Sequence, residues 1–284
     1  MRDLKAHPEL LALNGATVRE QWNLKQLVEG CARHGISAIA TWRDKVAEIG
    51  LDKAARLVKD SGLAVTGHCR GGMFPASDAA GRQKALDDNR RAVDEAAALG
   101  ARCLILVVGG IPPGSKSLAG AQGQVEEGIA RLLEYARKSR VDLAIEPLHP
   151  MYAADRACVN TLKHANDLCD KLAPGAKSGL GVAVDVYHLW WDPALQGEIA
   201  RAGRVAGRIM GFHVSDWLVP TTDLLLDRGM MGDGVIDIAM IRSWVEAAGY
   251  DGPVEAEIFS ARNWWKRDPD EVLTVCKERF RTVC

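Results

Sequence analysis

The feature that most constrains the fold of this chain is an alternation of short apolar runs with segments of helical periodicity. Such apolar runs are typical of strands buried on both faces, as in a parallel sheet covered by helices. Eight strands are predicted at residues 10–15, 36–42, 63–69, 101–110, 141–147, 179–186, 207–214 and 253–259. Helical segments are predicted at 23–35, 52–62, 82–100, 125–139, 162–173, 188–203, 238–252 and about 268–281.

Eight strand–helix units without a Ser/Gly-rich linker between them favour one closed barrel. The chain has 284 residues, and a (β/α)₈ barrel typically has about 250. We therefore predict the α/β class and a single (β/α)₈ TIM-barrel domain over residues 1–284. Two ordinary domains or a doubly wound sheet are the alternatives. No Walker motif is present, and GGIPPG after the fourth strand lacks the GxGxxG spacing of dinucleotide-binding folds.

Charge and composition disfavour several classes of protein. Apolar residues are 48% and the net charge is −1, so no electrostatic attraction to nucleic acid or membrane is visible. No apolar run reaches the roughly 18 residues of a membrane span, and the N-terminal segment lacks the continuous apolar run of a signal peptide. The seven cysteines are scattered without CxxC spacing, which is typical of reduced thiols. We expect a cytoplasmic protein.

Four consecutive strands end in a side chain that can bind a metal ion. All strand C-termini of a barrel open on one face, so these side chains can converge. They are Glu146, Asp185, His213 and Glu257. Three carboxylates and one imidazole suit one divalent cation, Mn²⁺ first, with Mg²⁺, Co²⁺ or Zn²⁺ as alternatives. The competing interpretation is that each acidic residue only caps a neighbouring helix.

Four sequence blocks resemble the signature blocks of one superfamily. They are AIEPLHP, AVDVYHLW, GFHVSDW together with DRGMMGDGVID, and EAEIFS. In this order and at strand ends, they resemble the xylose isomerase-like TIM-barrel superfamily, in particular its sugar isomerase and epimerase branch. That branch includes ketose 3-epimerases, hydroxypyruvate isomerase and inosose dehydratase. The resemblance covers essentially the whole chain.

The resemblance implies a role for each member of the metal-ligating set. Glu146, Asp185, His213 and Glu257 correspond to the family's metal ligands. Glu146 and Glu257 also correspond to its acid/base pair, which acts on opposite faces of a bound sugar. Removal of a proton next to a carbonyl requires such a base, and a bound cation stabilises the resulting enediolate charge.

Further residues are expected to bind substrate. His188, three residues after Asp185, and Arg228, in the sequence DRG, match substrate-binding positions of the family. His149 follows Glu146 at a place where the family varies, so we expect it to affect specificity. His68 ends the third predicted strand and can reach the same cavity.

The resemblance implies a divalent-metal-dependent sugar isomerase or epimerase that acts through an enediolate. The first alternative is a metal-dependent lyase or dehydratase on keto-sugars, either inosose dehydratase-like or 3-keto-glycoside-cleaving. A more remote alternative is an abasic-site endonuclease, which would need a trinuclear zinc site with more histidines. A metal-free binding module is disfavoured by the complete ligand set. The expected partner is a small sugar or keto-sugar, with no nucleic acid or membrane, and a homo-oligomer is compatible with the sequence.

Overall fold

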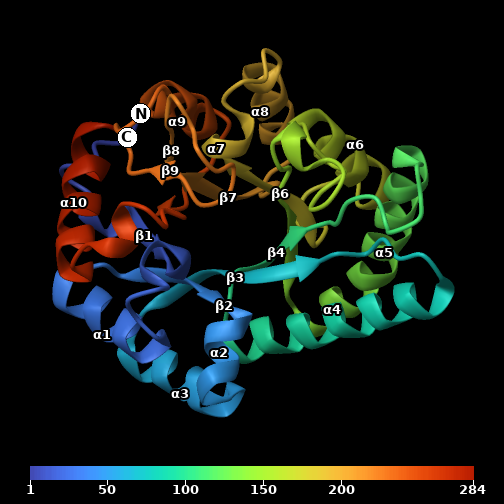
Figure 1. The fold of residues 1–284 in the computed structure, drawn as a ribbon, viewed down its shortest axis with the longest axis horizontal. Helices are drawn as coiled ribbons and strands as arrows, with labels where there is room; N and C mark the ends of the chain where they lie inside the picture. Colours follow the sequence, from blue (N-terminus) through green and yellow to red (C-terminus); the bar gives the residue numbers. More distant parts are fainter.

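A closed barrel of eight parallel strands forms the centre of the molecule (Figure 1). The computed structural model describes all residues 1–284. Around the barrel the strand order is β1, β2, β3, β4, β5, β6, β7 and β10, and β10 pairs with β1 to close the ring. The strands are β1 (Leu11–Asn14), β2 (Ala38–Trp42), β3 (Ala64–Gly72), β4 (Cys103–Val107), β5 (Asp142–Ile145), β6 (Leu180–Asp185), β7 (Ile209–Val214) and β10 (Val254–Ala256). The predicted (β/α)₈ barrel is confirmed, and the doubly wound sheet is excluded.

Helices surround the barrel on its outer side (Figure 1). They are α1 (Leu24–His34), α2 (Arg43–Ile49), α3 (Leu51–Ser61), α4 (Ala79–Leu99), α5 (Leu118–Ser139), α6 (Leu162–Leu172), α7 (Val186–Leu189), α8 (Leu195–Gly203), α9 (Ile238–Ala247) and α10 (Pro269–Thr282). Local sequence explains their ends. Asn23 and Gln26 form a capping box at the start of α1, and Gly35 ends that helix with a φ of 67°.

Several elements differ from the sequence-based prediction. The short helix α2 was not predicted, and α4 and α5 begin earlier than expected because Asp78 and Ser117 cap them. The expected helical return at 188–203 is divided into α7 and α8 around Pro193. The long loop after His213 contains two short antiparallel strands, β8 (Asp216–Trp217) and β9 (Arg228–Gly229).

The core has two layers. A large apolar cluster fills the space between the barrel and the helices, and a small cluster of six residues lies inside the barrel. The inner cluster consists of Cys69, Cys103, Ile105, Ala144, Ala183 and Met210. All seven cysteines are buried and free.

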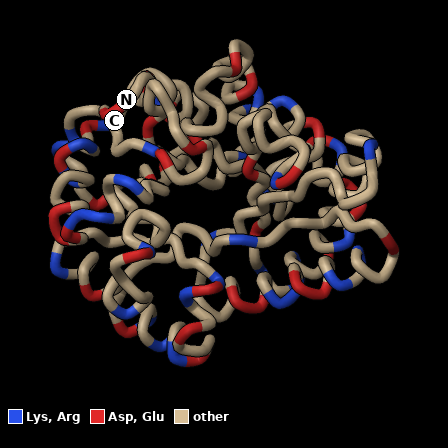
Figure 2. Tube along the Cα trace, in the orientation of Figure 1, with Lys and Arg blue, Asp and Glu red and all other residues tan.

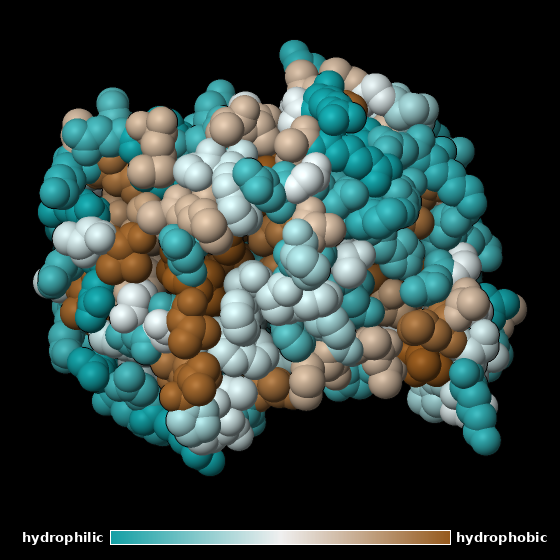
Figure 3. All heavy atoms as spheres, turned by 90° about the horizontal axis from the view of Figure 1, so that it is seen from above, coloured by the Kyte–Doolittle hydropathy of each residue, from teal (hydrophilic) through white to brown (hydrophobic).

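The outer surface is mixed in character. Acidic and basic positions are interspersed along the outer helices (Figure 2). On the face seen in Figure 3, a strip of hydrophobic residues lies among more hydrophilic surroundings. None of the helices combines the length and the apolarity needed to cross a bilayer.

Candidate metal centre

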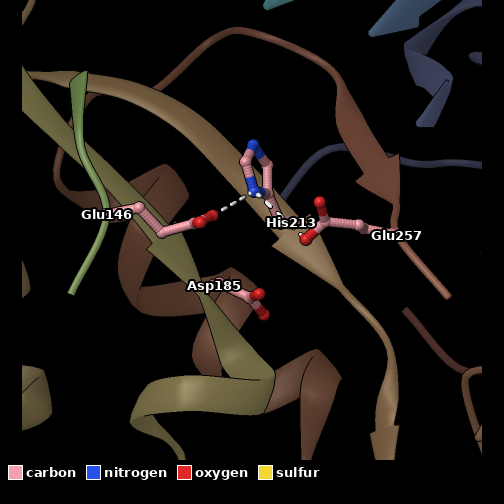
Figure 4. A group of neighbouring side chains, drawn as sticks. All are labelled: Glu146, Asp185, His213 and Glu257. Carbon is pink, nitrogen blue, oxygen red and sulfur yellow. Dashed lines mark hydrogen bonds and ion pairs between the residues drawn. The ribbon is translucent and has the colours of Figure 1, made fainter. Parts of the chain in front are cut away.

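Four side chains from successive strands meet at the C-terminal end of the barrel. Glu146 follows β5, Asp185 ends β6, His213 lies in β7 and Glu257 follows β10. Each offers a ligand atom, and these atoms all lie within 4.8 Å of one another (Figure 4). All four residues are buried. The convergence that the parallel barrel predicts is therefore present.

Hydrogen bonding orders the side chains within this four-residue cluster. Nδ1 of His213 lies 2.8 Å from Oε1 of Glu146 and 3.8 Å from Oε2 of Glu257. Asp185 also contacts the backbone: its Oδ1 accepts a hydrogen bond of 2.8 Å from the N–H of Tyr187 at the start of α7. The helix-capping interpretation thus applies to Asp185, in addition to its place in the cluster.

Burial gives the cluster unusual acid–base properties. Burial raises the pKa of Asp185 to about 6. Burial and the neighbouring Glu146 raise the pKa of Glu257 to about 7. Burial alone would lower the pKa of His213, but Glu255 and Glu146 raise it well above its usual range. Carboxylates that are buried close together repel one another, so the cluster is stabilised when it binds either protons or a cation.

The donor set fits a divalent cation. Three carboxylate oxygens and one imidazole nitrogen converge from rigid strand ends, and oxygen-rich sets of this kind suit Mn²⁺, Mg²⁺ and Co²⁺, and also accommodate Zn²⁺. Glu146, Asp185, His213 and Glu257 would hold such an ion.

Arg228 reaches the cluster from β9, in the long loop after β7. Its Nη1 lies 3.2 Å from Oδ2 of Asp185 and 3.3 Å from Oε2 of Glu257. The guanidinium packs over the rings of Tyr187 and Phe259, at 4.3 Å and 5.0 Å from their centres. Arg228 therefore contributes a buried positive charge that directly contacts two of the clustered carboxylates.

His188 adjoins the same carboxylates. Its Nε2 lies 3.1 Å from Nη2 of Arg228 and 3.6 Å from Oδ2 of Asp185. Burial and the charge of Arg228 lower the pKa of His188 well below its usual range, so the ring is neutral at pH 7. The backbone N–H of His149 donates to Nδ1 of His188 at 3.2 Å, and the ring of His149 stacks on Trp217 at 4.9 Å. The structure thus brings His188 and Arg228 to the cluster and His149 beside it.

His68 is not brought to the cluster. Its Nδ1 lies 2.9 Å from Oγ1 of Thr41, and its Nε2 lies 3.2 Å from Oε2 of Glu95 in α4. The neighbouring Cys69 points into the barrel, and successive side chains of a strand point to opposite faces. His68 therefore faces the helical layer, and we do not include it in the candidate site.

Glu255 is a buried carboxylate that the sequence-based prediction missed. Its Oε1 accepts a hydrogen bond of 2.7 Å from Asn14 and lies 3.6 Å from Nε2 of His213, and its Oε2 accepts from Thr66. Glu255 lies in β10 and Glu257 directly follows that strand, and residues two apart in extended backbone share a face. The sequence EAE in the last predicted strand could have indicated that Glu255 lies on the same side as Glu257.

A cavity lies near the C-terminal ends of β2 and β3, and the four clustered residues are not part of its wall. Its volume is about 620 Å³, and Trp42, Cys69 and Phe259 are part of its wall. The ring of Phe259 covers the guanidinium of Arg228, which contacts the cluster. Pockets for small molecules commonly measure about 300–1,000 Å³, so a sugar-sized ligand fits here.

Comparison with known proteins finds one matching family model and several similar proteins. The family model described as a xylose isomerase-like TIM barrel matches residues 28–276. The crystal structure of a protein from Sinorhizobium meliloti 1021 has a TM-score of 0.94 and 61% identity, covering 97% of this chain and 98% of that one. The IOLI protein, solved with a zinc atom, shares the fold with a TM-score of 0.81 and 19% identity, covering 96% and 97%. Inosose isomerase from Bacillus velezensis is 23% identical over 297 residues, covering 96% of each chain.

Proposed function

The chain belongs to the xylose isomerase-like TIM barrel family, and from that premise we propose that it is a divalent-metal-dependent sugar isomerase or epimerase. The observation that carries the proposal is the convergence of Glu146, Asp185, His213 and Glu257 within 4.8 Å at the C-terminal end of the barrel. Active sites of these barrels lie at that end. Mn²⁺ is the cation that we propose for this oxygen-rich set.

The proposed reaction begins with loss of a proton from the carbon next to a substrate carbonyl. A carboxylate must accept that proton, and a second group must return one. Glu146 and Glu257 are our candidates, because they approach His213 from different sides (Figure 4). Burial and the neighbouring Glu146 raise the pKa of Glu257 in the absence of a cation, whereas a bound cation would favour its carboxylate form, the form that can accept a proton. A bound divalent cation would polarise the carbonyl and stabilise negative charge on the substrate oxygens.

The neighbouring residues have supporting roles in this proposal. Arg228 and His188 would bind substrate oxygens, Arg228 as a permanent cation and His188 as a neutral imidazole. The wall formed by Trp42 and Phe259 would exclude water from one side of the substrate. An abasic-site endonuclease has weaker support, because the four-residue cluster contains a single histidine.

The test is carbon-bound exchange in D₂O. Mn²⁺-loaded protein is incubated with a panel of ketoses, inososes and 3-keto-glycosides, and deuterium position and product mass are measured. We expect metal-dependent entry of one deuterium, with product mass distinguishing isomerisation from elimination. Glu257→Gln, with metal content measured in the same sample, should abolish exchange. The matched control is Glu278→Gln on the exposed side of α10. A substrate that turns over without any carbon-bound deuterium would contradict the proposal.

A further inference from the structure

Four arginines line the cavity beside the cluster, and two of them are paired with carboxylates. Arg19 pairs with Asp44. Arg43 pairs with Asp88 at 2.8 Å and with Glu95 at 2.7 Å. These two arginines have their charge balanced within the protein.

Arg70 and Arg156 also line the cavity, and neither guanidinium has a hydrogen bond or an ion pair with the protein. Arg70 lies near the end of β3, directly after Cys69, and Arg156 lies in the segment after β5. Nε of Arg156 is buried without a partner. Burial, and then the positive charge of Arg156, lower the pKa of Arg70. The two guanidiniums therefore repel each other at one cavity wall, and neither has a hydrogen-bond acceptor in the protein.

This arrangement is unfavourable for the protein alone. A guanidinium that is partly removed from water and has no acceptor loses hydration, and two neighbouring cations repel each other. The carboxylates of the cavity do not relieve this cost. Asp44 and Asp88 already pair with Arg19 and Arg43, and Glu20 is exposed and lies 3.9 Å from Arg19. An oxyanion would supply the missing acceptors, because the planar guanidinium binds carboxylate or phosphate through two parallel hydrogen bonds.

The backbone next to Arg70 leaves room for such a group. Gly71 and Gly72 follow Arg70 and form part of the cavity wall. Gly72 has a φ of 107°, and a Cβ there would lie 1.9 Å from the carbonyl oxygen of Val107. The close approach of β3 to β4 thus requires glycine, and it leaves this part of the wall without side chains that would block a ligand.

We propose that Arg70 and Arg156 bind an anionic group of the substrate, a carboxylate or a phosphate, while its hydroxyl-bearing part reaches the four-residue cluster. This inference rests on the function proposed above and narrows the substrate class to sugar acids or sugar phosphates. The link between the two sites is Phe259, which forms part of the cavity wall and covers Arg228, and Arg228 contacts the cluster.

The experiment compares matched charged and neutral compounds by calorimetric titration of the full-length, Mn²⁺-loaded protein. D-ribulose 5-phosphate is compared with D-ribulose, and D-gluconate with D-glucitol, in a buffer free of phosphate. In at least one pair the anion should bind about tenfold tighter or more, because hydrogen bonds to charged groups contribute that much. The pair that shows this preference identifies phosphate or carboxylate as the group bound.

Variants link the preference to the two arginines. Arg70→Gln and Arg156→Gln should each reduce the preference for the anion by about tenfold and leave binding of the neutral compound unchanged. Arg131→Gln is the control, because it removes the same charge from the exposed side of α5. Arg70→Lys and Arg156→Lys keep the positive charge but lose the planar guanidinium that can donate two parallel hydrogen bonds. These variants should therefore retain only part of the preference for the anionic compound. Thermal unfolding and metal content establish that each variant is folded and loaded.

Two results would overturn the inference. One is equal binding of charged and neutral members of both pairs by the wild-type protein, and the other is a preference that persists in the Arg70→Gln, Arg156→Gln double variant. Deuterium exchange into neutral ketoses tests the metal centre separately. Exchange without any anion preference would keep the proposed function and reject the anion site. Arginine-dependent anion binding without exchange on any substrate would support the anion site and contradict the proposed function.

Discussion

Nε2 of His213 lies 3.6 Å from Oε1 of Glu255, on the side of the ring away from the four-residue cluster. The other ring nitrogen, Nδ1, lies 2.8 Å from Glu146. Asn14 and Thr66 hold the carboxylate of Glu255 through hydrogen bonds from β1 and β3. A carboxylate behind a metal-binding histidine orients the ring and raises its basicity. We therefore expect Glu255 to act as a positioning residue for His213.

Glu255→Gln should weaken metal binding by about 10–100-fold, the usual effect of losing such a partner. The amide keeps the size of the side chain and removes its negative charge. Calorimetric titration of the metal-free variant with Mn²⁺ measures the affinity, and Glu278→Gln on the exposed side of α10 controls for loss of one charge. Unchanged Mn²⁺ affinity in a folded Glu255→Gln protein would show that Glu255 only fills the barrel.

Metal binding should weaken as the pH falls below neutrality. In the metal-free protein, burial raises the pKa of Asp185 to about 6, and burial with Glu146 raises that of Glu257 to about 7. Below these values a cation must displace protons from both carboxyls. At neutral pH it must also displace the proton that the raised pKa of His213 keeps on the imidazole. Between about pH 7.5 and about pH 5.5 the affinity for Mn²⁺ should therefore fall at least about a hundredfold.

Calorimetry at several pH values measures this affinity, and repeating it in buffers of different ionisation enthalpy counts the protons released. An affinity that is independent of pH, without proton release, would contradict protonation of the empty cluster. The prediction applies to binding of the cation and is independent of which sugar the protein uses.

Arg228→Gln should reduce kcat/KM by at least about tenfold, which corresponds to a loss of about 1.4 kcal/mol of transition-state stabilisation. It should not weaken the binding of Mn²⁺. The guanidinium contacts Asp185 and Glu257, so its removal takes a positive charge away from the place where the cation binds. Metal affinity should therefore stay the same or increase. Arg242→Gln is the matched control, because Arg242 is also buried but pairs with Glu246 in α9. Loss of metal together with loss of activity would instead make Arg228 a structural support of the ligands.

His68→Gln should lower the stability of the fold and leave the chemistry unchanged. His68 is completely buried between Thr41 and Glu95, and loss of a buried hydrogen-bond partner typically costs about 1–3 kcal/mol. Urea unfolding measures the change in the free energy of unfolding. Metal affinity and deuterium exchange, measured on the folded protein, should match the wild type. A stable His68→Gln protein without exchange activity would return His68 to the candidate site.

The sequence by itself determined the barrel and the four clustered side chains. Apolar strands separated by helices have few other ways to bury both faces, and a parallel barrel brings all strand ends to one side. Glu146, Asp185, His213 and Glu257 could therefore be predicted to converge from their places at strand ends alone. Topology brings these strand ends to one side, and the four side chains also point toward one another, whereas His68, at the end of its own predicted strand, points to α4.

Only the tertiary structure decided which other residues join them. His68 and Cys69 are neighbours in the sequence, yet one faces α4 and the other the barrel interior, and register irregularities in β3 make that alternation hard to predict. Arg228 reaches the cluster through a long loop, and Arg70 and Arg156 line one cavity from distant segments. Such contacts depend on how loops pack against the finished barrel, because no local periodicity specifies the path of a loop or the face on which its side chains lie.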